Sequence, residues 1–107
     1  MLSDPALVDP LALLIQQQNT AQHRVKSRPI SSTDTLARVL REVRAPLMAI
    51  WGEQDATAGA WLRQREDILR GIDPDLDFRV MPGVGHWAMY EAPDAFAALL
   101  TELLAGP

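Results

Sequence analysis

Apolar residues recur at helical spacing over positions 7–43, which predicts two helices joined by a loop. The first helix should run from about Pro10 to about His23, because Asp9-Pro10 is a typical helix start. Residues 24–34 are basic and then rich in serine and threonine, which is typical of a loop. A second helix should begin after capping residues at 31–34 and end before Pro46. Its expected apolar face consists of Leu36, Val39, Leu40 and Val43.

The pattern changes to short strand-like runs after Pro46. Residues 47–51 are an unbroken apolar run closed by Gly52, which favours a strand buried on both faces of a parallel sheet. Residues 76–81 alternate between apolar and polar over their first five positions, which indicates a strand nearer the edge of a sheet. A helix should connect the strands over about 60–70, stopped by Gly71. We expect Trp61 and Leu62 in the core.

A last helix should begin near Pro93 and bury one leucine-rich face. The residues expected on that face are Phe96, Leu99, Leu100, Leu103 and Leu104. The predicted order is therefore helix, helix, strand, helix, strand, helix, with a right-handed strand–helix–strand unit and a parallel pair. Two parallel strands do not make a self-sufficient sheet, since a strand edge left open to water invites pairing. We expect the chain to belong to a larger protein or to associate with another copy.

Composition narrows the possible functions. The chain has 107 residues, of which 48% are hydrophobic and 22% charged, as in one small globular domain. A net charge of −4 argues against a nucleic-acid partner, and the basic residues of positions 24–28 are interpreted as a solvated loop. The absence of cysteine and the presence of only two distant histidines argue against a metal site. No apolar run reaches the roughly 20 residues of a membrane span, and the first residues are acidic, so a cytoplasmic protein without a membrane partner is expected.

The candidate catalytic residues follow the two predicted strands. Asp55 lies in the loop after the first strand, and His86 follows Pro82-Gly83-Val84-Gly85 after the second. Ligands of open α/β sheets bind at the carboxyl ends of the strands, so both side chains should lie on the same rim. A carboxylate that accepts the Nδ1–H of an imidazole fixes its tautomer and stabilises the imidazolium formed during catalysis. This pairing is typical of a catalytic acid–histidine arrangement.

Both loops resemble those of a known family. The segment Ala45–Asp55, which ends in Trp51-Gly52-Glu53-Gln54-Asp55, resembles the strand and acid loop of the α/β-hydrolase fold. Residues 81–93, from Met-Pro-Gly-Val-Gly-His-Trp to Glu-Ala-Pro, resemble that family's histidine loop and the start of its last helix. The resemblance implies a partial α/β-hydrolase fold: residues 35–107 hold the last two parallel strands and flanking helices, and residues 1–34 resemble the helical end of a cap.

The same resemblance assigns roles to individual residues. It makes Asp55, rather than the neighbouring Glu53, the triad acid and His86 the general base, and it implies no cofactor. Trp87 is a candidate substrate-binding residue, with packing beside the histidine loop as the alternative, and Glu91 is expected to organise that loop or the N-terminus of the last helix. The nucleophile should precede the acid in the chain. None of the four serines, which are Ser3, Ser27, Ser31 and Ser32, lies in a G-x-S-x-G frame.

These expectations leave three functions open. In the first, the chain is the C-terminal part of a cofactor-free hydrolase, inactive alone because the nucleophile and the oxyanion-hole segment are missing. The resemblance implies a small-molecule substrate of that parent enzyme: an ester, a carbon–carbon bond of dioxygenated aromatic breakdown products, a lactone, an epoxide or a haloalkane. In the second, the chain is a non-catalytic structural or interaction fragment. In the third, it is one half of a split enzyme completed by an N-terminal chain.

Overall fold

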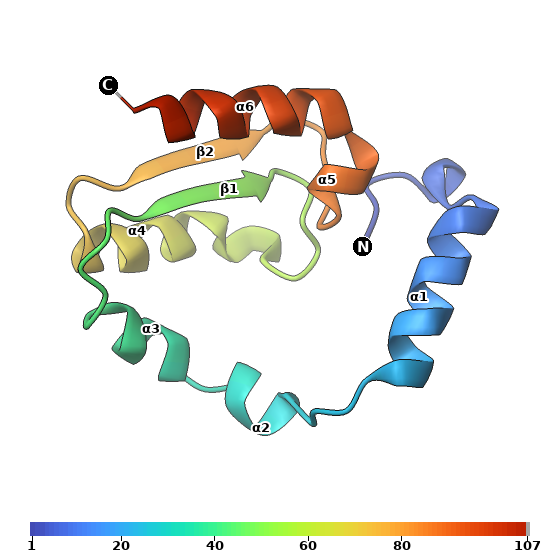
Figure 1. The fold of residues 1–107 in the computed structure, drawn as a ribbon, viewed down its shortest axis with the longest axis horizontal. Coiled ribbons are helices and arrows are strands. Elements are labelled where there is room, and N and C mark those ends of the chain that lie inside the picture. The colour runs from blue at the N-terminus through green and yellow to red at the C-terminus, as the bar shows by residue number, and fades with distance from the viewer. Residues whose placement is uncertain (107) are drawn as a thin grey trace.

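The computed structural model describes residues 1–106. Its centre is a two-stranded sheet in which β1 and β2 run parallel. Helix α4 lies on one face of this sheet and helix α6 on the other (Figure 1). The elements, with η for single 3-10 turns, are η1 (Pro5–Leu7), α1 (Pro10–Gln22), α2 (Arg28–Ser31), α3 (Thr35–Leu40), β1 (Met48–Gly52), η2 (Gly59–Trp61), α4 (Leu62–Ile72), β2 (Asp77–Met81), α5 (Ala88–Glu91) and α6 (Pro93–Ala105).

The parallel pair confirms the predicted strand–helix–strand unit. The register runs from Met48 opposite Asp77 to Gly52 opposite Met81, so both strands end at the same level. Each strand begins one residue later than the apolar pattern indicated, and the connection between them consists of η2 and α4. Because the strands are parallel and in step, the loops that follow them emerge side by side at one rim of the sheet.

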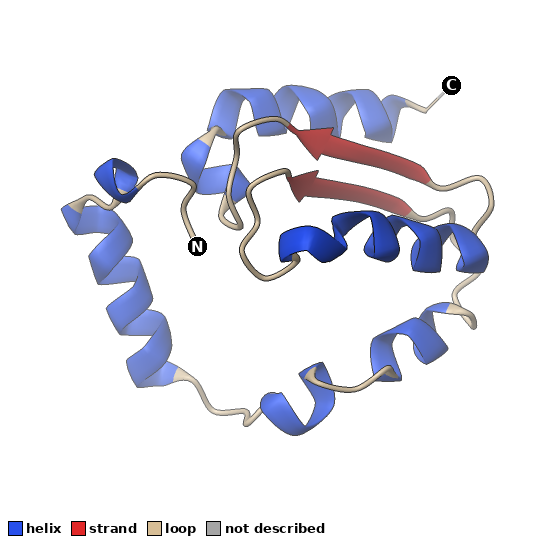
Figure 2. Ribbon diagram, turned by 180° about the vertical axis from the view of Figure 1, so that it is seen from behind, coloured by secondary structure: helices blue, strands red, loops and turns tan. Residues whose placement is uncertain are grey.

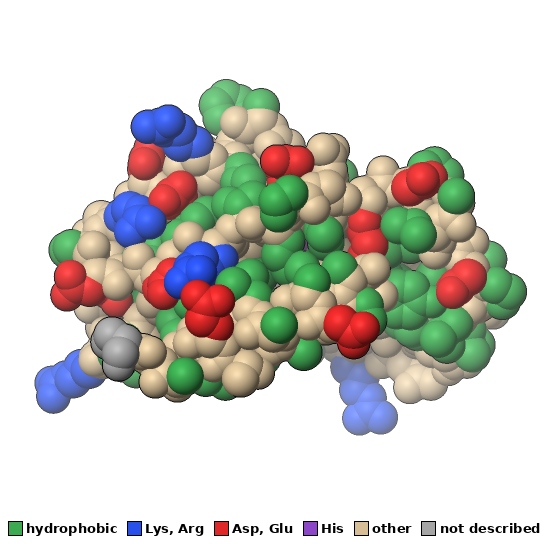
Figure 3. Space-filling view, turned by 90° about the horizontal axis from the view of Figure 1, so that it is seen from above, with side chains coloured by type: hydrophobic (Ala, Val, Ile, Leu, Met, Phe, Trp, Pro, Cys, Tyr) green, Lys and Arg blue, Asp and Glu red, His purple; other side chains and the backbone are tan. Residues whose placement is uncertain are grey.

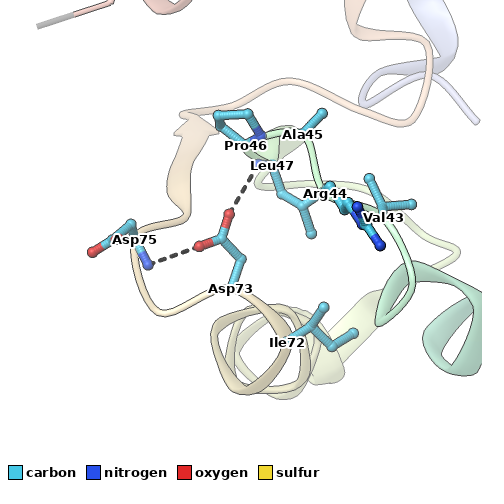
Figure 4. Close-up of a pocket in the computed structure, with 8 residues that line it drawn as sticks. All are labelled: Val43, Arg44, Ala45, Pro46, Leu47, Ile72, Asp73 and Asp75. Carbon is cyan, nitrogen blue, oxygen red and sulfur yellow. Dashed lines mark hydrogen bonds between the residues drawn. The ribbon is translucent and has the colours of Figure 1, made fainter.

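The opposite rim is fastened by Asp73, the residue that follows α4. Its carboxylate accepts a hydrogen bond from the backbone N–H of Leu47, immediately before β1, at 3.0 Å. The same carboxylate accepts the N–H of Asp75 in the turn leading to β2, also at 3.0 Å. Figure 4 shows these two bonds on one side of a shallow pocket between the segment before β1 and the end of α4. Asp73 therefore ties the end of the crossover helix to the start of both strands.

The core is small and lies between the sheet, the loop after β2 and the last helices. Met81, Val84 and Ala88 are buried, and partly buried apolar residues pack against them: Ile50, Ala92, Phe96 and Leu99. None of the large side chains in residues 1–106 is fully enclosed. No helix in this part of the chain is both long enough and apolar enough to cross a lipid bilayer. The fold thus buries one corner of the sheet well and leaves much of its apolar surface in contact with water.

The three N-terminal helices form an arc that leaves the sheet and returns to it (Figure 2). Helix α1 confirms the first predicted helix, with Asp9 as its cap and Pro10 at its first position. The segment of residues 24–34, expected to be all loop, contains the short helix α2, because Pro29 fits the first turn of a helix as well as it fits a loop. The second predicted helix is also shorter than expected. It ends at Leu40, since the next N–H groups bond three residues back in turns.

The connecting helix α4 differs from its prediction at both ends. It begins at Leu62 after the turn η2, and it continues through Gly71 to Ile72, so Gly71 does not stop it. The backbone N–H of Asp73 bonds to the carbonyl of Leu69, which closes the last turn without a glycine in the left-handed region. A glycine inside a helix costs about 1 kcal/mol relative to alanine, and the bond from the N–H of Leu47 to the Asp73 carboxylate adds one long-range contact just after it.

Several residues expected in the core are exposed. Trp61 is 62% exposed, Leu104 is 66% exposed and Leu100 is 38% exposed, so these three core predictions are wrong. Strand β1 is only half-buried where burial on both faces was expected. The alternation in β2 fails at Val80, which is 40% exposed. Figure 3 shows hydrophobic side chains along the face over α6 and again over η1 and α1. Sequence periodicity identifies an apolar face, but burial requires a neighbour, and residues 1–106 provide too few.

This exposed apolar surface, together with the open edge of β1, predicts self-association. In sedimentation velocity over a range of concentrations, the chain should form oligomers or precipitate, because an open parallel edge pairs readily. Met48→Lys, at the exposed start of β1, should weaken association, since charge on an edge opposes pairing. Gln17→Lys on α1 is the matched control and should change little. A monomer at all concentrations that unfolds cooperatively would contradict this prediction.

Candidate active site

Two loops meet at the carboxyl ends of the strands. The acid loop (residues 53–58) follows β1, and the histidine loop (residues 82–87) follows β2. The N–H of Glu53 donates to the carbonyl of Met81 at 3.0 Å, and the N–H of Gln54 donates to the carbonyl of Val84 at 2.8 Å. The Glu53 carboxylate accepts the N–H of Gly83 at 3.2 Å. Glu53, the alternative acid, therefore fastens the loops together and does not hydrogen-bond to the histidine.

A glycine at the end of β1 allows the two loops to come this close. A Cβ atom on Gly52 would overlap the carbonyl oxygens of Gly85 and Val84, which no side chain can tolerate. Gly83 has a φ of 69°, in the left-handed region that favours glycine, and this conformation turns the chain sharply after β2. The sequence pattern indicated a turn before His86, whereas the need for glycine at position 52 follows from the contact between the loops.

Asp55 and His86 are in direct contact. Oδ2 of the carboxylate lies 2.9 Å from Nδ1 of the imidazole. The Asp55 side chain is 5% exposed and that of His86 is 39% exposed, so the carboxylate lies beneath a ring that reaches the surface. Within residues 1–106 the ring's hydrogen bonds involve Nδ1, which leaves Nε2 free to face a reacting group. The structure thus brings together the two residues that the sequence singled out.

The carboxylate has further partners that the sequence analysis missed. Its Oδ1 accepts the N–H of Thr57 at 2.8 Å and the Thr57 hydroxyl at 2.7 Å. Its Oδ2 also accepts the indole N–H of Trp51 at 2.8 Å. The order Asp-Ala-Thr signals the first pair, because an aspartate commonly accepts the N–H of the second residue after it. The bond from Trp51 has no such signal, since it depends on how the loop folds back over β1.

These hydrogen bonds set the ionisation of the carboxyl group. Burial by itself raises the pKa of Asp55, but the hydrogen bonds from His86 and Thr57 outweigh burial and lower its pKa to about 2 from the ordinary 3.8. Asp55 is therefore ionised at neutral pH. A charged oxygen facing Nδ1 favours the imidazole tautomer with its proton on Nδ1, which leaves the lone pair on Nε2.

A second carboxylate holds the histidine loop from the other side. Glu91 accepts the N–H of Gly85 at 3.0 Å, the N–H of Ser3 at 3.1 Å and the Ser3 hydroxyl. Burial raises the pKa of Glu91, but these bonds outweigh burial and lower it. The N–H of His86 donates to the carbonyl of Met1 at 2.6 Å. Glu91 organises this loop as expected, and it does so by joining the loop to the N-terminal segment.

The hydroxyl groups near the site do not supply a nucleophile among residues 1–106. Ser3 is bonded to Glu91, and the other three serines lie at or in α2. The Thr57 hydroxyl lies 3.4 Å from the His86 ring, but on the Nδ1 side, and it donates to Asp55. A nucleophile activated by His86 would have to approach Nε2 from outside these residues.

An open groove of about 500 Å³ runs from the acid–histidine pair along β1 to α6. Asp55, His86 and Trp51 line one end, and the other lining residues are mostly apolar, among them Met48, Ile50, Phe96, Leu100 and Leu103. Trp87 is not among the lining residues. Its ring packs edge-on against that of Tyr90, with centroids 6.0 Å apart, so the packing alternative fits this conformation and a substrate contact stays a prediction.

Comparisons with known proteins give a consistent result. The model of a family described as "Alpha/beta hydrolase family" matches residues 2–99. A 2-hydroxy-6-oxo-6-phenylhexa-2,4-dienoate hydrolase of Burkholderia cepacia is 34% identical over 77 residues, which cover 72% of this chain and 26% of that protein. A 2-hydroxy-6-oxononadienedioate/2-hydroxy-6-oxononatrienedioate hydrolase of Paraburkholderia phymatum is 32% identical over 65 residues. These residues cover 61% of this chain and 22% of that protein. The chain spans about a quarter of the length of these curated relatives. No solved structure gives a significant match.

Alanine should have opposite effects on stability at Gly52, where the two loops come close, and at Gly71, where there is open space. Gly52→Ala should lower the free energy of unfolding by at least about 2 kcal/mol, because the added methyl group overlaps backbone carbonyls. Gly71→Ala is the matched control, since a Cβ there meets nothing within 4 Å inside α4, and it should stabilise by roughly 0.5–1 kcal/mol. Urea unfolding measures both. Equal stability of the two variants would contradict the contact at Gly52.

The lowered pKa of Asp55 predicts a loss of stability in acid. A carboxyl group whose pKa is lower in the folded state stabilises that state above the unfolded pKa, and this stabilisation disappears as the pH falls through the folded value. The window here lies between about pH 4 and pH 2, and the contribution is roughly 2 kcal/mol. Urea unfolding of the wild type and Asp55→Asn at pH 6 and near pH 2 measures it. The difference between the two proteins should shrink at the lower pH, and a constant difference would refute this account.

Proposed function

This chain belongs to the alpha/beta hydrolase family, and we propose that it supplies the acid and the histidine of a hydrolase's catalytic triad. The observation that carries the proposal is the 2.9 Å contact between Asp55 Oδ2 and His86 Nδ1 at the carboxyl ends of two parallel strands. The carboxylate is ionised at neutral pH, and Nε2 of the partly exposed ring makes no hydrogen bond within residues 1–106. These are the requirements of a general base held in position by an acid.

The proposed chemistry assigns one task to each atom of the pair. Nε2 of His86 takes the proton of a nucleophile as that nucleophile attacks the substrate, and returns it to the leaving group. The imidazolium formed in between is stabilised by Asp55 Oδ2 through the Nδ1 proton. In the second half of the reaction, Nε2 activates water to release the covalent intermediate. The protein side chains supply every proton transfer, so this mechanism needs no cofactor.

We propose that the nucleophile and the oxyanion donors come from other residues, because no hydroxyl group among residues 1–106 is bonded to Nε2 of His86. Two arrangements satisfy this requirement: a longer polypeptide that includes this chain, or a separate chain that docks against it. In either arrangement the apolar groove beside His86 lies between the pair and the added residues. We propose that residues 35–107 contribute this part of the hydrolase core and that residues 1–34 contribute to a cap over the site.

The substrate class that we favour is a small molecule with an ester or a carbon–carbon bond next to a carbonyl group. The two relatives are named as hydrolases of compounds with a 6-oxo group, and such a carbonyl is the electrophile that a triad nucleophile attacks. The mostly apolar lining of the groove favours a substrate with an apolar portion.

A second candidate function is supported by the surface of the chain. The open edge of β1 and the exposed apolar residues favour a role in association, in which the chain pairs its sheet with a partner and performs no chemistry itself. This role is compatible with a split enzyme, because the partner strand could also bring the nucleophile. The two candidates differ in whether Asp55 and His86 are needed once the partner is present.

A hybrid enzyme tests the leading proposal. The matching part of the Burkholderia cepacia hydrolase is replaced by this chain, and hydrolysis of that enzyme's named substrate is followed. Asp55→Asn should lower kcat by about 10⁴-fold and His86→Ala by about 10⁶-fold, because each removes a member of the triad. His23→Ala is the matched control: His23 lies at the end of α1, bonded to the carbonyl of Thr20, and its replacement should leave kcat unchanged.

The isolated chain provides the complementary measurement. It should hydrolyse activated esters no faster than its own His86→Ala variant, because residues 1–106 position no nucleophile at Nε2. A hybrid that keeps full activity with His86 replaced by alanine would contradict the catalytic assignment and favour the association role.

A further inference from the structure

Trp51 occupies a position that links the sheet, the groove and the buried acid. It lies near the end of β1, and its ring stacks beside that of Phe78 on β2, with centroids 6.0 Å apart and an angle of 26° between the planes. The side chain lines the groove that leads to His86. Its indole N–H donates to Asp55 Oδ2 at 2.8 Å. The strand therefore holds a rigid donor against the carboxylate that contacts the histidine.

We propose that Trp51 is a positioning residue for the acid–histidine pair, whose indole N–H shares Oδ2 of Asp55 with the imidazole, holds this oxygen in place and takes up part of its charge. The inference rests on the proposed function only for the roles of Asp55 and His86. The contact itself is a property of the folded chain.

The division of donors between the two carboxylate oxygens supports this role. Oδ1 receives both of its bonds from Thr57, in the same loop. Oδ2 receives one bond from Trp51 and faces the histidine with the other lone pair. Without the indole, Oδ2 would be anchored only by the group that it is meant to orient. The carboxylate could then tilt about the oxygen held by Thr57, and the distance to Nδ1 would no longer be fixed.

The indole also moderates the charge that the histidine faces. An N–H donor withdraws electron density from the oxygen it bonds to, so a shared Oδ2 is a weaker acceptor for the Nδ1 proton than an unshared one. His86 is the titratable side chain bonded to Asp55, while the carboxylate of Glu53 is engaged with the N–H of Gly83. Among the described residues, His86 is therefore the charged or titratable partner of Asp55 whose response would show the removal of the indole N–H.

The Nδ1 proton of His86 reports on this arrangement directly. In ¹⁵N-labelled chain, Trp51→Phe keeps an aromatic ring beside Phe78 and removes the N–H, so the resonance of the Nδ1 proton should move downfield or disappear through faster exchange. Trp61→Phe is the matched control, because Trp61 is 62% exposed and its indole makes no hydrogen bond within residues 1–106, so the resonance should stay in place. An unchanged Nδ1 proton in a folded Trp51→Phe variant would overturn the proposal.

A reciprocal variant covers the case in which Trp51→Phe does not fold. Asp55→Asn weakens the acceptor and keeps the volume, so the indole N–H resonance of Trp51 should move and exchange faster with solvent, while that of Trp61 should not change. Identical indole resonances in wild type and Asp55→Asn would overturn the proposal. Neither measurement involves a substrate, so a hybrid enzyme that fails to hydrolyse anything would count against the proposed function and leave this inference standing.

Discussion

The buried carboxylate of Asp55 is the constraint on which the rest of the site depends. Burying an ionised group costs several kcal/mol unless hydrogen bonds replace the lost water. Here the donors come from three places: Trp51 on β1, Thr57 in the acid loop and His86 in the histidine loop. Satisfying this one charge therefore requires the strand and both loops to be in their observed positions. The same bonds keep the group ionised, which is the state that a catalytic acid–histidine pair needs.

The two ends of the sheet are held by many contacts, whereas its faces and edges are left partly uncovered. At one rim, backbone bonds and the missing side chain of Gly52 bring the loops together, and at the other Asp73 fastens α4 to the strands. By contrast, β1 pairs with one strand within residues 1–106, and apolar side chains on α1, β1 and α6 face solvent. A buried carboxylate that is fully hydrogen-bonded, beside apolar surface that lacks a covering layer, fits a chain that works with further polypeptide. The family relatives, about four times as long as the matched regions, fit the same view.

Sequence patterns predicted the helices and strands well where neighbouring residues alone specify the backbone conformation. The cap at Asp9, the apolar run of β1 and the proline at the start of α6 each specify backbone conformation within a few residues, and each element formed where expected. The predictions failed where the outcome depended on distant contacts. Trp61 and Leu104 belong to apolar stripes, yet whether a stripe is buried depends on which element lies against it. Helix α4 passed through Gly71, and just after it the carboxylate of Asp73 accepts the N–H of Leu47, a remote contact that no local rule includes.

The sequence by itself determined the α/β fold class, the parallel pair of strands and the two residues of the candidate site. Asp55 and His86 could be named from sequence because each follows a strand and the ends of parallel strands must lie on one rim. Only the tertiary structure decided how the pair is held: Trp51 and Thr57 on the carboxylate, Glu91 on the loop, and Gly52 at the closest approach. The physical reason is range. Strand and helix preferences act between near neighbours in sequence, whereas the donors that satisfy a buried charge are selected by three-dimensional proximity after the loops have packed.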